Sequence, residues 1–306
     1  MSEQYQTTMK SLLTDAKRVL VDKSNQKDSA LGEVKTFKRG VLPPVPWFPA
    51  VALLPVNETV ERVYSGGKYV VRRELSFDVW CRSYKFKEAE KDCIRVLTDA
   101  RDVLEDNYKL PGSDGNETTV DIWFGTQELA DAEPFQKGFL QSATMRIAFS
   151  SQEDVPSARK IVVDLKQNTP KEMLSLIFNT VKEYGGSLLS DVVKFHEVAV
   201  PPIPLFPAVA VVEADVAGSH YETGRDESSR RFMLWVWTKL LDKEVNLDRN
   251  LDVVEMVKDV VQIEYRWGGY AKDTVLNNIA YGQMPLDNYS VYATGVEIDV
   301  LCARTL

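Results

Sequence analysis

Apolar residues recur every three or four positions in four stretches of the chain, a spacing that places them on one face of an α-helix. The stretches cover residues 9–20 and 87–107 in the first half, and residues 173–181 and 247–261 in the second. Thr169-Pro170 precedes the third stretch, and proline is favoured in the first turn of a helix. We therefore expect two helices in each half, with Gly185-Gly186 stopping or bending the third.

Other segments alternate between inward-facing apolar residues and outward-facing ones, the pattern of a strand with one buried face. Leu75, Phe77, Val79 and Cys81 alternate in this way with Ser76, Asp78 and Trp80. The same alternation appears at residues 144–149 and 296–300. These segments are predicted to be strands, and the last two are predicted to close the two halves of the chain.

A hairpin is predicted upstream of the first alternating segment. Ser65-Gly66-Gly67-Lys68 is a typical turn sequence, and it would join strands over residues 60–64 and 69–81. A separate strand over residues 50–54 is expected before it, with a counterpart over residues 208–212.

Residues 232–237 read FMLWVW, with no polar break. Such a strand should be covered on both faces, by a helix on one side and by another subunit or domain on the other. The alternative is a central strand sandwiched within its own domain. Trp235 and Trp237 are therefore candidate interface residues.

The two halves repeat one another. Residues 37–52 read FKRGVLPPVPWFPAVA and residues 195–210 read FHEVAVPPIPLFPAVA, with nine of sixteen positions identical at an offset of 158. Farther along, Val79-Trp80 matches Val236-Trp237 at an offset of 157. The period is far longer than that of a solenoid repeat, so we interpret the chain as a tandem duplication of one domain, with copies at residues 1–155 and 156–306.

The order of elements in each copy predicts the fold class. Each reads helix, proline-rich arm, three strands, helix and two strands. This order is typical of an α+β domain with a mostly antiparallel sheet and helices packed on one face.

The proline-rich arms cannot be helices or central strands, because proline lacks an N–H and fixes φ. They are predicted to be extended, either as stiff connectors packed on their own core or as ligands for SH3-type domains. Phe48 and Phe206 are interpreted as core anchors. The candidate interface residues of the arms are Pro43, Pro44, Pro46, Trp47, Phe48, Pro201, Pro202, Pro204 and Phe206.

Charge and hydropathy narrow the function classes. The net charge of the chain is −8. Residues 1–153 hold 23 acids and 21 bases, which gives a charge of −2, and residues 154–306 hold 22 acids and 16 bases, which gives −6. Neither half has the basic cluster that specific nucleic-acid binding needs. No apolar run is long enough for a membrane helix, and the N-terminus lacks the plan of a signal peptide, so we expect no membrane partner and a cytoplasmic product.

The residues that usually carry catalysis or bind metals are sparse. The three cysteines are not closely spaced, so we predict that they are buried as small apolar residues. The two histidines, His196 and His220, are interpreted as surface residues, with His220 in a polar turn. No phosphate loop, calcium loop or zinc pattern is present. We expect no cofactor, no metal and no enzymatic activity, although a buried perturbed carboxylate would escape a sequence-based search.

The layout resembles the tail terminator, or tail completion, proteins of long-tailed bacteriophages. The resemblance covers most of both halves and is carried by Phe48-Pro49-Ala50-Val51-Ala52, by residues 75–80 with the helix at 87–107, and by their counterparts in the second copy. Two features depart from the family: a typical member is a single domain, and the arm here is more elaborate.

The resemblance implies a structural virion protein of the tail or neck, made in the host cytoplasm. It would form a ring that terminates the tail tube and joins it to the capsid connector, with the tail tube protein and connector or neck proteins as partners and genomic DNA only passing through the lumen. Because the family's ring is six-fold, a duplicated chain could build it as a trimeric pseudo-hexamer or form a hexameric ring. The alternatives are a neck or other minor virion protein, a duplicated non-enzymatic binding or assembly module, and an enzyme with an unrecognised site.

Overall fold

The computed structural model describes residues 8–24, 29–42, 46–62, 68–107, 109–110, 121–154, 169–197, 205–215, 219–222, 225–286 and 289–303. It is a mixed α/β structure whose strands pair mostly antiparallel, as the sequence predicts. The chain divides into two compact units. The first comprises Met1–Glu58 and Arg62–Glu153, and the second comprises Thr59–Glu61 and Asp154–Leu306.

The first unit has its strands in the order β4-β6-β3-β2, with β1 paired parallel to β2 and β5 paired antiparallel to β6. Its elements, in chain order, are α1 (Met9–Ser24), β1 (Thr36–Arg39), β2 (Ala50–Arg62), β3 (Lys68–Ser83), α2 (Phe86–Asp106), β4 (Asp121–Leu129), β5 (Glu133–Phe135) and β6 (Gly138–Asp154).

The second unit has the order β11-β12-β10-β8-β7, with β9 paired to β10 and β7 parallel to β8. Its elements are α3 (Pro170–Glu183), β7 (Lys194–Glu197), β8 (Ala208–Asp215), β9 (Ser219–Glu222), β10 (Arg225–Leu240), α4 (Lys243–Ile263), β11 (Ala271–Leu286) and β12 (Tyr289–Ala303).

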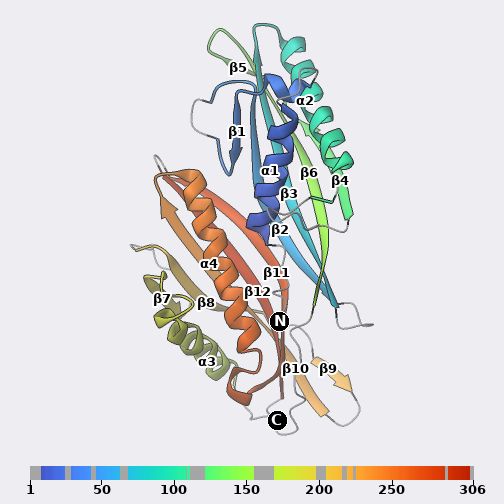
Figure 1. The fold of residues 1–306 in the computed structure, drawn as a ribbon. Helices are drawn as coiled ribbons and strands as arrows, with labels where there is room; N and C mark the ends of the chain where they lie inside the picture. The colour runs from blue at the N-terminus through green and yellow to red at the C-terminus, as the bar shows by residue number, and fades with distance from the viewer. Residues whose placement is uncertain are drawn as a thin grey trace. The chain divides into compact units, whose positions relative to one another are not determined.

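Helices cover one face of the strands in each unit (Figure 1). The predicted stripe of α2 is buried in full, and Leu247, Leu251, Val254, Val257 and Val261 of α4 are buried as predicted. On the strands, alternate residues meet the helices: Phe232, Leu234 and Val236 of β10 join Val296, Ile298 and Val300 of β12 in one core. This apolar contact supplies most of the stability of such a helix–sheet layer.

The helix start predicted at Thr169-Pro170 is confirmed. The Thr169 side chain accepts a hydrogen bond from the Glu172 N–H, and the Glu172 carboxylate accepts one from the Thr169 N–H, which completes a capping box. A short 3-10 helix, Tyr184–Gly186, follows α3 at the predicted stop.

Two strand predictions are wrong. The strands predicted at 50–54 and 60–64 are not separate, because Ala50–Arg62 forms a single strand, β2, which continues through Pro55; residues 63 and 64 lie outside the described residues. Pro55 lies beyond the Ala50–Leu53 segment that pairs with β1, so its missing N–H interrupts none of the bonds to β1. In addition, β1 and β7 form before the arms, where no strand is predicted. The glycines of the predicted turn, Gly66 and Gly67, lie outside the described residues.

The backbone around the two arms is built in the same way. The Lys35 N–H donates to the Pro49 carbonyl at 2.8 Å, and the Val193 N–H donates to the Pro207 carbonyl at 2.9 Å. The parallel pairings also correspond, because Thr36 faces Ala50 and Lys194 faces Ala208. Both Phe–Pro peptide bonds are cis.

The predictions for the two histidines, His196 on the surface and His220 in a turn, are wrong. His196 lies on β7, which packs beside α3 and β8, and is therefore half-buried. Among the described residues, its Nε2 has no hydrogen-bond partner. His220 lies in strand β9, which pairs with β10, rather than in a turn. The three cysteines are free and buried, as predicted.

Candidate functional site

The helix-free face of the first unit carries an apolar cluster. Leu42, Ala50 and Ala52 form its buried part, and Phe48, Leu54 and Trp80 pack against it. Its strand residues, Ala50, Ala52 and Leu54 of β2 and Trp80 of β3, follow the two-residue period of a strand. The aromatic ring of Phe48 also meets Phe135 of β5 edge-on, with centroids 6.0 Å apart.

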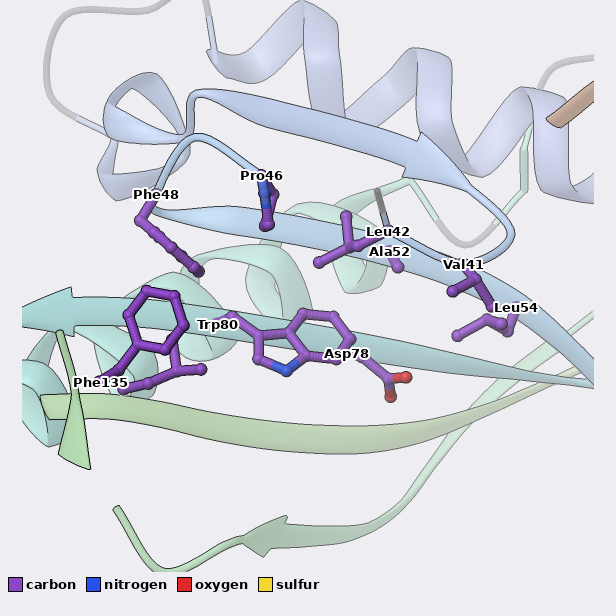
Figure 2. Close-up of a pocket in the computed structure, with 10 residues that line it drawn as sticks. Val41, Leu42, Pro46, Phe48, Ala52, Leu54, Asp78, Trp80 and Phe135 are labelled. Atoms are coloured by element: carbon purple, nitrogen blue, oxygen red, sulfur yellow. The ribbon is translucent and has the colours of Figure 1, made fainter. Parts of the chain in front are cut away.

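A pocket of about 340 Å³ opens in this cluster (Figure 2). Nine of its ten lining residues are apolar, and Asp78 is the exception. Figure 2 shows the Trp80 indole between the Phe135 ring and the Asp78 carboxylate, with Phe48 and Pro46 above it and Leu54 at the far end. We call this cavity the Asp78 pocket.

The arm is fastened where it borders the Asp78 pocket. The Thr36 hydroxyl donates to the Trp47 carbonyl at 2.9 Å and accepts from the Trp47 N–H at 3.1 Å. Together with the bond from Lys35 to Pro49, these contacts hold residues 46–49 against β1. Phe48 therefore turns toward the sheet, while the Trp47 side chain is 80% exposed.

A wider groove adjoins the Asp78 pocket and shares Pro46, Phe48 and Phe135 with it. Its volume is about 630 Å³, and its other walls include Trp47, Arg82 and Tyr84. The Tyr84 side chain is 77% exposed. The Arg82 guanidinium lies 5.6 Å from the Phe135 ring centroid, where a cation–π interaction orients it.

Asp78 is half-buried on the floor of an apolar cavity. Burial raises the pKa of its carboxyl above the ordinary value, and the hydroxyls of Ser76 and Thr144 and the charge of Arg146 oppose that rise only in part. The Ser76 hydroxyl donates to Oδ1 of Asp78 at 2.6 Å. The hydrogen bonds and the nearby charge therefore do not fully offset the loss of hydration of the ionised carboxylate, and a positive group in the pocket would stabilise it.

The matching face of the second unit carries a different apolar cluster. Trp235 and Trp237 pack with Ala210, Val291, Ala293 and the half-buried Phe206. Lys239 Nζ lies 6.0 Å from the Phe206 ring centroid. At the offset of 157, Trp237 corresponds to Trp80 and Trp235 to Asp78, so an indole stands where the first unit has a carboxylate.

The arrangement brings some of the predicted interface residues together. Pro46 and Phe48 border the Asp78 pocket, and Phe206, Trp235 and Trp237 share one cluster. The Trp47 side chain is largely exposed and lines the adjoining groove. The remaining predicted interface residues, Pro43, Pro44, Pro201, Pro202 and Pro204, lie outside the described residues.

Within its own unit, the FMLWVW strand is covered on one face and partly covered on the other, where Met233 and Trp235 are half-buried. One face lies in the core under α4, and the other carries Trp237, which is only 7% exposed. β10 is central, between β12 and β8. Of the two interpretations of this strand, the central strand within its own domain describes its place in the sheet.

Comparisons with known proteins assign no family. The sequence matches no protein-family model, and no curated relative is found. Among solved structures, the chain is similar to one from the "Virion of native gene transfer agent (GTA) particle", with a TM-score of 0.34 and 15% identity. The superposition covers 49% of this chain and 100% of that chain. Similarity at this level does not assign a function.

The Asp78 pocket offers apolar walls and one carboxylate. Within those residues, no three His, Cys, Asp or Glu side chains are grouped to hold a metal ion. None of the described helices has the length and apolarity needed to cross a bilayer. Sequence reasoning missed Asp78, Trp80 and Phe135 as site residues. The repeat offers one signal, because the aligned positions 78 and 235 differ in charge.

Proposed function

We propose that the chain is a non-enzymatic structural protein of a tailed-phage virion, and that it forms the ring that terminates the tail tube and joins it to the capsid connector. The observation that carries the proposal is the recurrence of one construction in both units. The Lys35–Pro49 and Val193–Pro207 bonds and the matched parallel strands support a tandem duplication. A chain with two like units has the geometry from which a pseudo-symmetric ring is built.

Surface properties support assembly with other proteins. In the first unit, the helix-free face combines an apolar pocket with the exposed side chains of Trp47 and Tyr84, and aromatic residues are enriched where proteins meet. The net charge of −8 suits a ring through which DNA passes, because like charge prevents adhesion to the lumen. Three chains would give pseudo-six-fold symmetry, and six chains would give a true hexamer.

The oligomeric state tests this proposal. The purified chain should form rings in negative-stain images, with three-fold or six-fold class averages, and light scattering should give the mass of three or six chains. Rings that bind end-on to purified tail tubes would distinguish a joining protein from a general assembly module. A monomer at micromolar concentration, in light scattering and in images alike, would overturn the ring.

A further inference from the structure

The Asp78 pocket has the composition of a site for one amphipathic side chain. Its walls are apolar, and Trp80, Phe48 and Phe135 present aromatic rings that would bury an alkyl stem. The single carboxylate lies beside the indole of Trp80, so a cation that reached Asp78 would also meet an aromatic face.

The charges around Asp78 favour a cation as the missing partner. Ser76 and Asp78 lie on the same face of β3, and Arg146 of β6 is the positive charge that acts on Asp78. Arg146 is exposed and its effect is the smallest of those acting on the Asp78 carboxyl, so solvent screens its charge and it does not neutralise the carboxylate. The pocket-lining residues on β2, Ala52 and Leu54, bring no charge.

The second unit carries a different side chain at the corresponding position of the same face. Trp235 occupies the position of Asp78, and its indole fills the space beside Trp237. The carboxylate beside the shared indole position is thus a feature of the first unit and is not a consequence of the fold. This contrast also suggests a blocking substitution, Asp78→Trp, which introduces the residue type found at the corresponding position of the second unit.

The surroundings of the pocket indicate a protein ligand. The cavity continues into the groove lined by Trp47 and Tyr84, which are 80% and 77% exposed. A segment of polypeptide lying in that groove would bury both aromatic side chains, and Trp and Tyr are the side chains that most often anchor protein interfaces. A free amine would leave them in solvent.

We infer that the Asp78 pocket receives a lysine or arginine side chain, flanked by an aromatic residue, from a partner protein. The stem lies against Trp80 and Phe48, the cationic head meets the Asp78 carboxylate, and the flanking residue packs in the groove beside Tyr84. This inference does not depend on ring formation: a monomeric protein that binds as described would overturn the ring and leave the pocket assignment in place.

Labelled peptides test the assignment by fluorescence anisotropy with the full chain. The peptides are Gly-Phe-X-Phe-Gly, with lysine, arginine, norleucine or glutamate at X. The lysine and arginine peptides should bind at least about tenfold more tightly than the norleucine peptide, since a charge-assisted hydrogen bond distinguishes them. Asp78→Asn should remove that difference, and Asp78→Trp should abolish binding of all four.

The control variant is Asp102→Asn, an exposed acid on α2 that does not line the pocket, and it should bind as the unmodified chain does. Melting curves establish that each variant is folded. Equal affinity for lysine and norleucine, no binding of either, or unchanged binding by Asp78→Asn overturns the assignment. If n-butylammonium binds as tightly as the lysine peptide, the site is one for small amines, and the protein ligand is wrong.

Discussion

The indole of Trp235 stacks on that of Trp237, with ring centroids 5.8 Å apart and planes inclined by 24°. The stack needs space on the neighbouring strand, and Gly295 of β12, directly opposite Trp235, provides it. A Cβ at position 295 would lie 2.9 Å from Met233 Sδ and 3.2 Å from Trp235 Cζ3. The packing of the two indoles thus depends on the absence of a side chain at position 295.

The substitution Gly295→Val should therefore destabilise the second unit by about 1–3 kcal/mol, the usual range for overpacking. Urea unfolding followed by tryptophan fluorescence measures the loss. Gly186→Ala is the control, because a Cβ there meets nothing within 4 Å. Equal stability of the Gly295→Val variant and the unmodified chain would show that the stack rearranges without penalty.

A second prediction concerns the ion pair between Arg73 and Glu58 in the first unit. Both side chains are at most 2% exposed; the guanidinium Nε lies 3.2 Å from Glu58 Oε2, and a second nitrogen donates to the Ser151 hydroxyl at 2.7 Å. Glu58→Gln should reduce the free energy of unfolding by about 3–5 kcal/mol, because it removes the carboxylate with which a buried guanidinium is paired.

The control for that pair is Glu105→Gln, which removes a weak contact with Arg101 at 3.9 Å on the exposed surface of α2. Its effect should be below about 1 kcal/mol. Thermal melts of both variants at neutral pH give the comparison. Similar small losses in the two variants would mean that the buried arginine has other sufficient partners.

The helices and the closing strands could be predicted from the sequence because their signals are local. The stripe of α2 and the alternation at residues 144–149 and 296–300 each lie within one short segment. β1 and β7 could not be predicted, since Thr36–Arg39 and Lys194–Glu197 are short, partly polar segments that become strands by pairing with β2 and β8. Asn250 of α4 is likewise buried only because Val236 and Thr294 bond to its amide.

Only part of the candidate site, the proline-rich arm, could be predicted from the sequence. The arms were identified from their prolines, but Phe135 comes from β5, which no pattern indicates, and Asp78 resembles any outward-facing position of an alternating strand. Its burial arises when the arm folds back and Phe48 and Pro46 border the cavity. A contact between segments distant in sequence thus turns an ordinary polar residue into a site.

A third prediction concerns the start of α3. The Glu172 N–H donates to the Thr169 hydroxyl at 3.3 Å, and the Thr169 N–H donates to Glu172 Oε2 at 2.6 Å. Thr169→Ala should cost about 1 kcal/mol of stability, because an N–H of the first turn loses its acceptor. Hydrogen exchange at the first turn of α3 should accelerate in this variant and stay slow in Thr169→Ser. Equal exchange in both would refute the role of the cap.

The last prediction follows from the raised pKa of Asp78. Its cause is burial, so the folded chain holds the proton of this carboxyl more tightly than the unfolded chain does. The contribution of Asp78 to stability therefore falls as the pH rises from the ordinary pKa of an aspartate through the raised one, and is constant above it. Asp78→Asn removes this dependence while its amide oxygen still accepts from Ser76.

The Asp78→Asn variant should consequently gain stability relative to the unmodified chain as the pH increases from about 3 to about 8, which spans the range in which carboxyl groups titrate. Urea unfolding at several pH values, with Asp102→Asn beside it, measures the difference. Arg146 is the charge acting on Asp78, so Arg146→Gln should enlarge the gain by withdrawing the attraction that partly offsets burial. A stability difference between Asp78→Asn and the unmodified chain that does not change with pH would mean that water solvates the Asp78 carboxylate as fully as in the unfolded chain. The electrostatic argument for a cationic partner would then fail.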